Sequence, residues 1–540
     1  PAWCTTLPRI FPFLFSFESR QRLLDCCGFG SSHALYRFQE HKIAAYRTQQ
    51  ADTFRSAQQR LARAQEHQDI DGISRASDEV DEIERRIYSR RIGAIASDLA
   101  RVSRDDILDN ATRLLEYHHS CKHLLEVQFH KEDGFGSGVT QNFYEAVSVA
   151  LQTRSVNQEL KLWISDGHDQ EYALDSSGAF KYLINPEGLF PQPLPPSSPP
   201  SVVDNIKAQF RFIGRLFGKA CRDKFTVPLP LHPHFFTLIL RANQDTSFHH
   251  SPGAMPLVLL KSFGRSSQDI PASEDWTSMD LLRAFSHVAR MIEQECAGLD
   301  PGARQIVFDR FAQTEFMRTH LNRTYECSLG GFLSSSDFRF VDRLTDAPLC
   351  PGGKDIELTV DKLSEFVHLT AEMWFVEGVQ VQLEAFRAGV NDVFPFPSLA
   401  ILSASEVDVM LCGERRIEWD KEALLKHIKL VSNEQGAKYD KNSVPIQLLV
   451  TELVEMSNAD RARFLDFVTA CPRLPPGGLA SLNIEIAPEK RDLTRSRYPR
   501  SRTCAKLMWL PYYTTQSEMR ECLLAALANA KEGGFHEVNH

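Results

Sequence analysis

The chain has 540 residues, of which 43% are hydrophobic and 24% are charged, as in ordinary globular proteins. Its formal net charge of −9 is spread along the sequence, which argues against a nucleic-acid partner. No apolar run approaches the roughly 18 to 20 residues that cross a bilayer, so we expect no membrane partner. A chain of this length exceeds what one core supports and predicts about two to four structural units.

The start of the chain and its cysteines indicate its setting. The sequence begins at Pro1, without an initiator methionine or a signal peptide, so we expect a fragment of a longer protein. Its 12 cysteines are scattered, and Cys26 and Cys27 form the only close pair in the sequence. This distribution predicts neither a disulfide framework nor a paired zinc motif, and the cytosol or the nucleus is the expected location.

Residues 1–103 predict an N-terminal helical extension. PFLFSFESRQRLL, 12–24, is typical of an extended stretch that leads into a helix near Ser19. Residues 53–90 are rich in Gln, Arg, Glu and Ala, so they form either a polar helix or a disordered insert. We favour a solvated connector over 51–78, because helical periodicity returns only near Val80.

The next segment predicts a helix over 104–121 and an alternating strand that begins at Leu124. In HHSCKH, 118–123, His119 and His123 lie about one helical turn apart and raise the question of a metal site. No flanking acid or cysteine pair completes a ligand set, so we expect exposed imidazoles at a helix end and no metal site.

Glycines mark two further features. Three alternate glycines at 134–138 resemble a phosphate cradle, but their spacing fits neither a P-loop nor a dinucleotide motif, so we interpret them as a turn before a helix. QFRFIGRLFGKA, 209–220, predicts a helix in which Gly214 and Gly218 allow another helix to approach closely.

The middle of the chain predicts a helix at 278–295 and one or two helices at 365–395. Between them, Phe338 and Phe340 alternate with Arg339, so one face of a strand would be aromatic. Both a hydrophobic groove and an ordinary core strand remain open interpretations of this pattern.

The C-terminal region contains the candidate nucleophile. VSNEQGAKYDKNSV, 431–444, is polar and lacks apolar periodicity, which predicts a hinge at 431–438. Residues 496–513 predict an exposed loop that feeds a short apolar strand, with Thr503 and Cys504 at the junction. Most cysteines are small buried hydrophobic residues. Here, however, four basic neighbours favour the nucleophilic thiolate: Arg497, Arg500, Arg502 and Lys506.

The run Tyr-Pro-x-x-x-Thr-Cys, a strand ending in Leu-Pro-x-Tyr and a Gly-Phe-His tail resemble the catalytic end of HECT-type ubiquitin ligases. FPFLFSFESRQ, RFIGRLFGKA, GGKDI and LCG occur in the family's order, so the resemblance extends over nearly the whole chain. The pattern is most similar to the thyroid-receptor-interactor and plant ubiquitin-protein-ligase class.

The resemblance implies an α+β, bilobal fold with a large, mainly helical N-lobe and a smaller α/β C-lobe that carries the cysteine. The implied segments are an N-terminal extension (1–103), the N-lobe (104–430) with a small partner-binding subdomain at about 270–360, a hinge (431–438) and the C-lobe (439–540). Cys412, in the family's Leu-Cys-Gly turn, is expected to be buried and inert.

The implied activity is that of a ubiquitin transferase. Cys504 would take ubiquitin from a conjugating enzyme as a thioester and pass it to a substrate lysine, with Thr503 positioning the acyl group. Phe366, Phe338 and Phe340 would contact the conjugating enzyme, and Phe535 and His536 would form the functional tail. The implied partners are ubiquitin, a conjugating enzyme and protein substrates recruited by upstream regions. No cofactor is expected.

Several positions depart from the family's pattern. Ala470 stands where the family has a turn glycine, so the backbone there must avoid a positive φ or carry strain. Tyr498 replaces the usual leucine, and Arg502 stands where histidine is common. The departures at Tyr498, at Ala470 and in the tail motivate one alternative, a degenerate module that only binds ubiquitin or a conjugating enzyme. A second alternative is a cysteine hydrolase, which would need a histidine and an acid beside the thiol.

Overall fold

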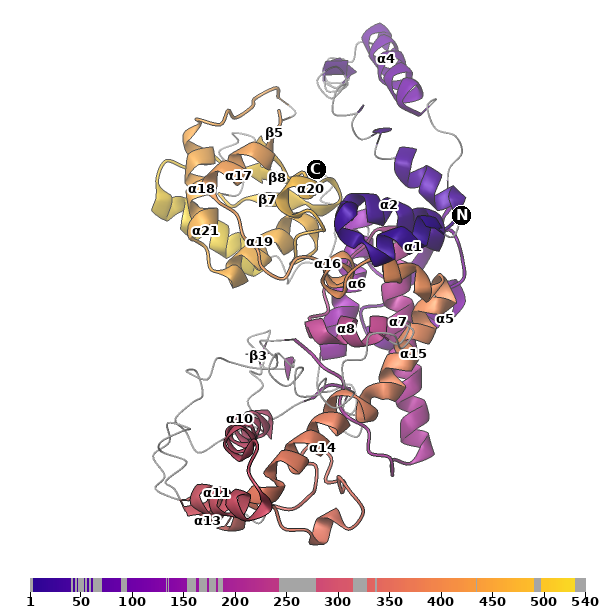
Figure 1. Ribbon diagram of the computed structural model, residues 1–540. Coiled ribbons are helices and arrows are strands. Elements are labelled where there is room, and N and C mark those ends of the chain that lie inside the picture. The colour runs from indigo at the N-terminus through magenta and orange to yellow at the C-terminus, as the bar shows by residue number, and fades with distance from the viewer. Residues whose placement is uncertain are drawn as a thin grey trace. The chain divides into compact units, whose positions relative to one another are not determined.

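Figure 1 shows the computed structural model, which describes residues 3–39, 70–88, 95–152, 162–164, 172–173, 181–182, 188–241, 278–313, 328–489 and 497–529, except 133, 135, 336, 337 and 434, together with some residues between 42 and 61. The chain divides into two compact units: unit 1 comprises 1–151, 215–229 and 390–540, and unit 2 comprises 152–214 and 230–389. The fold is mixed α and β and mainly helical. None of its described helices is long and apolar enough to cross a membrane.

The N-terminal part of unit 1 contains α1 (Trp3–Ile10), η1 (Pro12–Leu14), α2 (Phe17–Gly28), α4 (Ile70–Tyr88), β1 (Ser97–Val102), α5 (Ile107–His118), β2 (Leu124–Phe129) and α6 (Ser137–Gln152). The predicted helix near Ser19 is confirmed as α2, whose first turn is capped by the Ser16 hydroxyl, which accepts a hydrogen bond from the Ser19 amide. The favoured connector is wrong over residues 70–78, which belong to α4.

The predicted helix and strand that follow are confirmed as α5 and β2. Their partner strand β1 was not predicted. It pairs with β2 in parallel, from Ser97 opposite Leu124 to Val102 opposite Phe129. The Thr140 hydroxyl of α6 accepts a hydrogen bond from the Val127 amide at 3.0 Å, so the first turn of α6 is fixed to the edge of this sheet.

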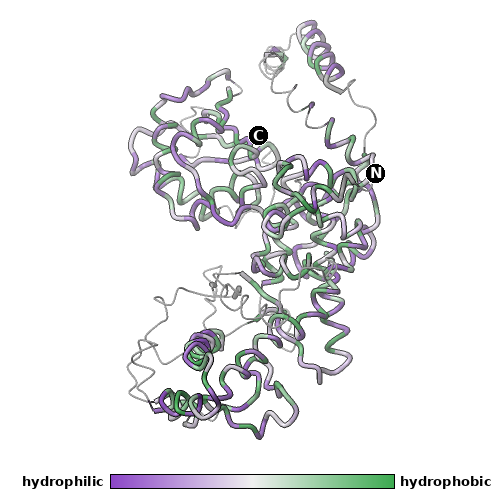
Figure 2. Tube along the Cα trace, in the orientation of Figure 1, coloured by the Kyte–Doolittle hydropathy of each residue, from purple (hydrophilic) through white to green (hydrophobic). Residues whose placement is uncertain are grey.

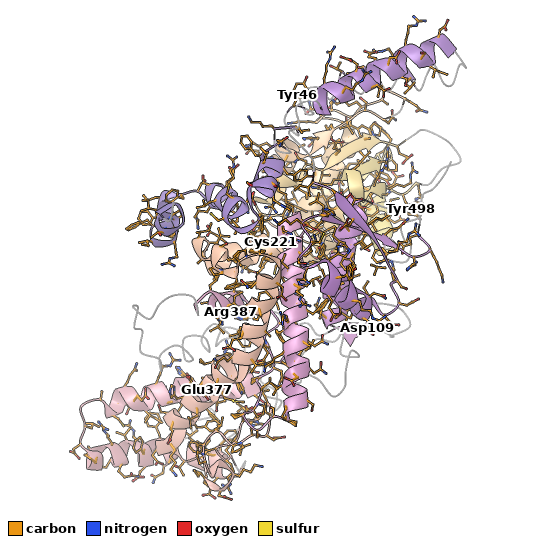
Figure 3. The ribbon with its side chains drawn as sticks, turned by 90° about the vertical axis from the view of Figure 1, so that its right-hand side faces the viewer. Tyr46, Asp109, Cys221, Glu377, Arg387 and Tyr498 are labelled. Atoms are coloured by element: carbon orange, nitrogen blue, oxygen red, sulfur yellow. The ribbon has the colours of Figure 1, made fainter. Side chains whose placement is uncertain are left out.

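The prediction that Gly214 permits close helix approach is confirmed. Gly214 lies in α7 (Pro200–Asp223), and a Cβ atom there would lie 2.2 Å from the Phe386 carbonyl oxygen of α15 (Gln380–Val393). The two helices run side by side in both views of the ribbon (Figures 1 and 3). Only a residue without a Cβ atom allows the two backbones to come this close.

Unit 2 also contains β3 (Tyr172–Ala173), β4 (Lys181–Tyr182), α8 (Pro233–Arg241), α10 (Ser278–Cys296), α11 (Pro301–Gln313), α13 (Leu329–Ser335), η4 (Gly353–Asp355), η5 (Val360–Lys362), α14 (Leu363–Phe375) and η6 (Glu377–Val379). The helices α10, α14 and α15 confirm those predicted at 278–295 and 365–395. Arg387 of α15, labelled in Figure 3, donates hydrogen bonds of 2.8 Å to the carbonyl oxygens of Leu238 and Ile239. It thereby satisfies carbonyl groups that the last turn of α8 leaves without helical partners.

The remainder of unit 1 contains η7 (Phe396–Ile401), α16 (Ala404–Cys412), α17 (Lys421–His427), β5 (Lys429–Leu430), α18 (Val444–Glu455), α19 (Asn458–Thr469), α20 (Gly478–Leu482), β6 (Glu485–Pro488), β7 (Arg500–Arg502), η8 (Thr503–Ala505), β8 (Leu507–Leu510) and α21 (Gln516–Asn529). The strands form one sheet in the order β5-β6-β8-β7, in which β7 is antiparallel to β8 and the other pairs are parallel. Hydrophobic and hydrophilic residues alternate along the surrounding helices, as amphipathic helices against a core require (Figure 2).

One hydrophobic core holds this sheet, and it includes buried residues from Ile417 to Leu527. Residues on both sides of the proposed hinge belong to it: Leu424 and Ile428 precede the segment 431–438, and Tyr439 follows it. The Val431 amide also donates to the Ile486 carbonyl oxygen at 2.9 Å. The hinge stays a prediction. A fragment used to test it must begin no later than Ile417, so that this core is complete.

Candidate functional site

The backbone of Cys504 lies in the turn of a β-hairpin. Arg502 at the end of β7 pairs with Leu507 at the start of β8, so the four residues between them form the connection. Thr503 to Ala505 make one turn of 3₁₀-helix, and the Lys506 amide closes it by donating to the Thr503 carbonyl oxygen at 3.1 Å. Thr503 is half-buried. The predicted strand is confirmed as β8, but the expectation of a loop throughout 496–503 is wrong at β7, whose backbone groups pair with β8.

The strand that follows the cysteine is fixed in the core. Met508 and Leu510 of β8 are both fully buried, and β8 lies between β6 and β7 in the sheet. On the other strand of the hairpin, the Ser501 hydroxyl donates to the Phe467 carbonyl oxygen of α19 at 2.5 Å. Both arms are therefore anchored, one by burial and one by a hydrogen bond, and a short turn between anchored arms has few conformations available.

Of the two outcomes expected at Ala470, avoidance of a positive φ or backbone strain, the structure has the second. It ends α19 with φ 56° and ψ 31°, in the left-handed region, and its amide still donates to the Asp466 carbonyl oxygen at 2.8 Å. A left-handed conformation costs a non-glycine residue about 1–2 kcal/mol. The chain thus keeps the helix end that glycine would give, at a cost to its stability.

The basic residues near Cys504 are partly neutralised. Arg500 makes a two-pronged ion pair with Glu489, at 3.0 and 2.7 Å, and Arg497 contacts Glu521 at 3.0 Å. Burial lowers the pKa of the Lys506 ammonium from its ordinary value, with a smaller opposing contribution from Cys471. The support for a thiolate is therefore weaker than four neighbouring positive charges imply.

The segment before β7 is fixed by an aromatic side chain. Tyr513 is buried, and its hydroxyl donates to the Arg497 carbonyl oxygen at 2.6 Å. The Arg497 guanidinium in turn lies 5.8 Å from the centre of the Tyr498 ring, which is 39% exposed (Figure 3). The substitution of tyrosine at 498 is thus accommodated at the surface, where its size meets no steric limit.

Three buried cysteines in the described part of the chain are poor nucleophiles. Burial raises the pKa of the Cys221 thiol to about 12 and that of the Cys471 thiol to about 11. Burial likewise raises the pKa of Cys412, which is fully buried, as predicted. A thiol that stays protonated at neutral pH neither attacks carbonyl carbons nor is alkylated readily.

The three phenylalanines expected to contact a partner are buried in unit 2. Phe338, Phe340 and Phe366 are 8%, 1% and 4% exposed. Phe285 of α10 lies between two of them, with ring centres 5.5 Å from Phe338 and 6.2 Å from Phe366. Phe338 and Phe366 also line a small apolar depression together with residues of α10 and α14. Their partner role stays a prediction, and the depression is a place where a partner could reach Phe338 and Phe366.

Two expected site residues lie beyond the described part of the chain: Phe535 and His536. Conversely, sequence reasoning missed Glu489, whose side chain is 6% exposed and pairs with Arg500. Its one signal is its place directly after the apolar strand β6, which pairs with β8. Reading Glu489 as the partner of Arg500 requires the strand order of the sheet.

The chain is similar to known proteins over its whole length. A family model described as HECT-domain (ubiquitin-transferase) matches residues 150–537. E3 ubiquitin-protein ligase Ufd4 of Drosophila melanogaster is 28% identical over 99% of this chain, and E3 ubiquitin-protein ligase UPL3 of Arabidopsis thaliana is 30% identical over 99%. E3 ubiquitin-protein ligase TRIP12 of Danio rerio is 28% identical over the same share. The chain spans only 20%, 25% and 23% of these three relatives.

Proposed function

Because the chain belongs to the HECT-domain (ubiquitin-transferase) family, we propose that it is a ubiquitin-protein ligase that carries ubiquitin as a thioester on Cys504. The observation that supports this assignment most is the position of Cys504 in the short turn η8, between two anchored strands. A nucleophile on such a turn can be presented to a large partner while its backbone stays fixed. Ubiquitin, a conjugating enzyme and a protein substrate are the partners that this reaction requires.

The first step is a thioester exchange. The Cys504 thiolate attacks the carbonyl carbon that joins ubiquitin to the conjugating enzyme, a new C–S bond forms, and the conjugating enzyme's thiolate leaves. Because the bond broken and the bond formed are alike, the protein has to supply geometry and a fair thiolate population rather than a driving force. Arg502 and Lys506 supply that population, and Thr503 with neighbouring backbone amides positions the acyl group.

The second step transfers ubiquitin to an amine. An unprotonated substrate lysine attacks the same carbonyl carbon, an isopeptide bond forms, and the Cys504 thiolate leaves. This step requires removal of a proton from the lysine and stabilisation of the negatively charged oxygen. The tail residues Phe535 and His536 are proposed to contribute here.

The proposed organisation follows the family. An N-lobe at 104–430 would receive the conjugating enzyme through a subdomain at about 270–360, and a C-lobe at 439–540 would carry the cysteine. The apolar depression lined by Phe338 and Phe366 supports a docking position in unit 2. Phe340, at 1% exposed, would act by supporting the Phe366 ring, whose centre lies 5.8 Å away.

Two of the departures from the family's pattern are compatible with activity. Ala470 adopts the left-handed conformation that glycine would adopt, and Tyr498 is accommodated at the surface. The degenerate, binding-only alternative therefore loses part of its motivation. It is retained as one outcome of the experiment.

The test is incubation of the chain with activating enzyme, conjugating enzyme, ubiquitin and ATP. We expect a ubiquitin adduct that reductant removes, that is lost in Cys504→Ala, and that becomes resistant to reductant in Cys504→Ser because the adduct is then an ester. Cys26→Ser, at an exposed cysteine remote in sequence, is the matched control and should keep the adduct.

Three results would contradict the proposal. An undiminished adduct in Cys504→Ala moves the nucleophile elsewhere. Capture of the conjugating enzyme without any thioester supports the binding-only alternative. Release of free ubiquitin from a chain without ATP indicates a hydrolase.

A further inference from the structure

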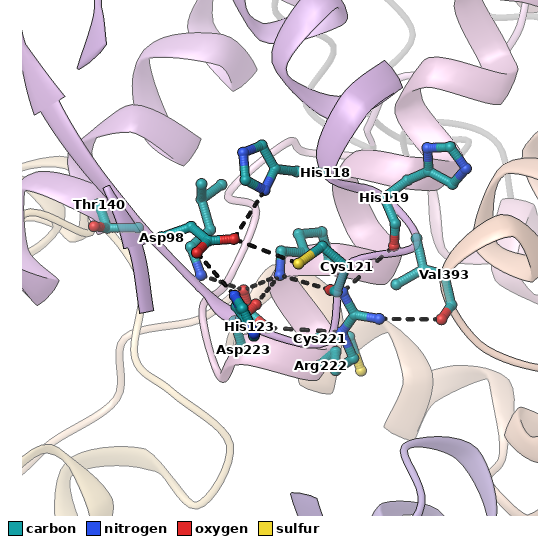
Figure 4. A network of polar contacts seen from close by, with 12 residues as sticks. Asp98, His118, His119, Cys121, His123, Thr140, Cys221, Arg222, Asp223 and Val393 are labelled. Carbon is teal, nitrogen blue, oxygen red and sulfur yellow. Dashed lines mark hydrogen bonds and ion pairs between the residues drawn. The ribbon is translucent and has the colours of Figure 1, made fainter. Parts of the chain in front are cut away.

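Four side chains with metal-binding donor atoms meet where β1, α5 and the loop before β2 converge (Figure 4). Asp98 lies on β1, His118 ends α5, and Cys121 and His123 follow in the loop. One ligand atom each from Asp98, His118 and Cys121 lies within 4.8 Å of the other two. Two of the three separations involve the Asp98 Oδ2 atom: 3.4 Å to the Cys121 Sγ atom and 3.7 Å to the His118 Nδ1 atom.

These separations suit a tetrahedral metal site. Zinc bonds of about 2.0–2.3 Å place the ligand atoms of a tetrahedron about 3.3–3.8 Å apart. Both oxygen-to-donor distances fall in this range without any movement of the side chains. A set of one carboxylate, one imidazole and one thiolate contains the three donor types that zinc binds.

Two side chains of α7 hold the backbone of the loop that carries Cys121 by hydrogen bonds. The Lys219 ammonium, on α7, donates to the His123 carbonyl oxygen at 2.6 Å, and the Arg222 guanidinium donates to the carbonyl oxygens of Cys121 and His119. Lys219 is fully buried and paired with Asp223 at 2.8 Å, so its positive charge is compensated next to the cluster. Fixed backbone positions reduce the conformational entropy that ligand side chains lose when a metal binds.

The remaining two histidines have different surroundings. The His123 Nδ1 atom lies 2.8 Å from the Asp98 Oδ1 atom, the carboxylate oxygen that contacts neither Cys121 nor His118. This is the arrangement by which an outer partner orients a metal-binding group. His119 instead contacts its own helix, because its Nδ1 atom lies 3.1 Å and 3.0 Å from the carbonyl oxygens of Leu115 and Glu116.

We propose that Asp98, His118 and Cys121 bind one zinc ion, with His123 orienting the carboxylate and a water molecule as the fourth ligand. On binding, the Cys121 thiol releases its proton to solvent and its sulfur forms the metal bond, so no electron transfer is involved. The ion would join β1 to the loop between α5 and β2. The site uses Asp98, which lies twenty residues before His118, and it excludes His119, one of the two histidines that the sequence had suggested.

The proposal is tested by titrating the metal-free chain with Co²⁺, which reports a thiolate ligand by a sulfur-to-cobalt charge-transfer absorption. We expect one equivalent to bind with this absorption, and Zn²⁺ to displace it. Cys121→Ser should abolish the absorption. Asp98→Asn and His118→Gln should each weaken binding by more than about tenfold, and His123→Gln by about 10- to 100-fold.

The matched controls are His119→Gln, a neighbouring histidine in contact with its own helix, and Cys26→Ser, an exposed cysteine. Both should bind like the original chain. Circular dichroism of each variant reports whether it is folded, and His123→Gln tests the site without altering a direct ligand.

Three outcomes overturn the proposal: no stoichiometric binding of Co²⁺ or Zn²⁺ by the original chain, an absorption that survives Cys121→Ser, or equal losses in His119→Gln and His118→Gln. The first would leave a cluster held by hydrogen bonds alone. None of these outcomes depends on ubiquitin transfer, so they are independent of the proposed function.

Discussion

Replacement of Gly214 by alanine tests a close approach of two helix backbones in unit 2. An added Cβ atom would lie 2.2 Å from the Phe386 carbonyl oxygen and 3.0 Å from the Gly389 Cα atom, both of which are backbone atoms of α15. Ordinary contact begins near 3.4 Å, so α7 and α15 would have to separate locally by at least 3.4 − 2.2 = 1.2 Å. No side-chain rotation can relieve this clash.

The expected change in the free energy of unfolding follows from two opposing effects of Gly214→Ala. Overpacking of a close-packed interior costs about 1–3 kcal/mol, and a contact against rigid backbone belongs at the upper end. Alanine gains about 0.5–1 kcal/mol over glycine within a helix. We therefore expect Gly214→Ala to lower the free energy of unfolding by about 2 kcal/mol.

The measurement is urea unfolding followed by circular dichroism, with hydrogen exchange of α7 and α15 to locate the effect. Gly302→Ala is the matched control, because Gly302 is an exposed glycine of α11 whose added Cβ atom would approach only the Asp300 side chain, at 3.3 Å. It should be neutral or slightly stabilising. A Gly214→Ala variant as stable as Gly302→Ala would refute the reasoning about the α7–α15 contact.

Three further predictions concern the hairpin and its surroundings. Glu489→Gln removes the carboxylate that pairs with Arg500, so the uncompensated positive charge should favour the Cys504 thiolate and thioester formation at neutral pH should become faster. An unchanged rate would contradict this. Lys506→Gly removes the strain of a non-glycine residue in the left-handed region, with φ 51°. Urea denaturation should show a free energy of unfolding higher by about 0.5–1 kcal/mol. Thioester formation should become slower, because the positive charge of Lys506 is lost. Burial raises the pKa of Cys471 to about 11, so its thiolate fraction at neutral pH is lower in the folded chain than in the unfolded chain. Mass spectrometry should therefore find iodoacetamide labelling of the exposed Cys26 well before that of Cys471. Equal labelling rates would count against this prediction.

Elements whose signals are local could be predicted from the order of residues alone. The residues from 12 to 24 predict the helix near Ser19 that is α2, the alternating pattern from Leu124 predicts β2, and helical periodicity predicts α10 and α14. Gly214 was also identified from spacing, because close helix approach needs a small residue wherever the second helix comes from. Cys504 became a candidate through the order of motifs along the chain.

Features that depend on residues distant in sequence could be identified only in the folded chain. The pairing of β7 with β8 turned an expected loop into a strand, and the position of β6 beside β8 brought Glu489 to Arg500, reducing the positive charge near the cysteine. β1 likewise carried Asp98 to His118 and Cys121. Charge compensation and ligand geometry depend on distances of a few ångströms in space, and a linear pattern records only separations along the chain.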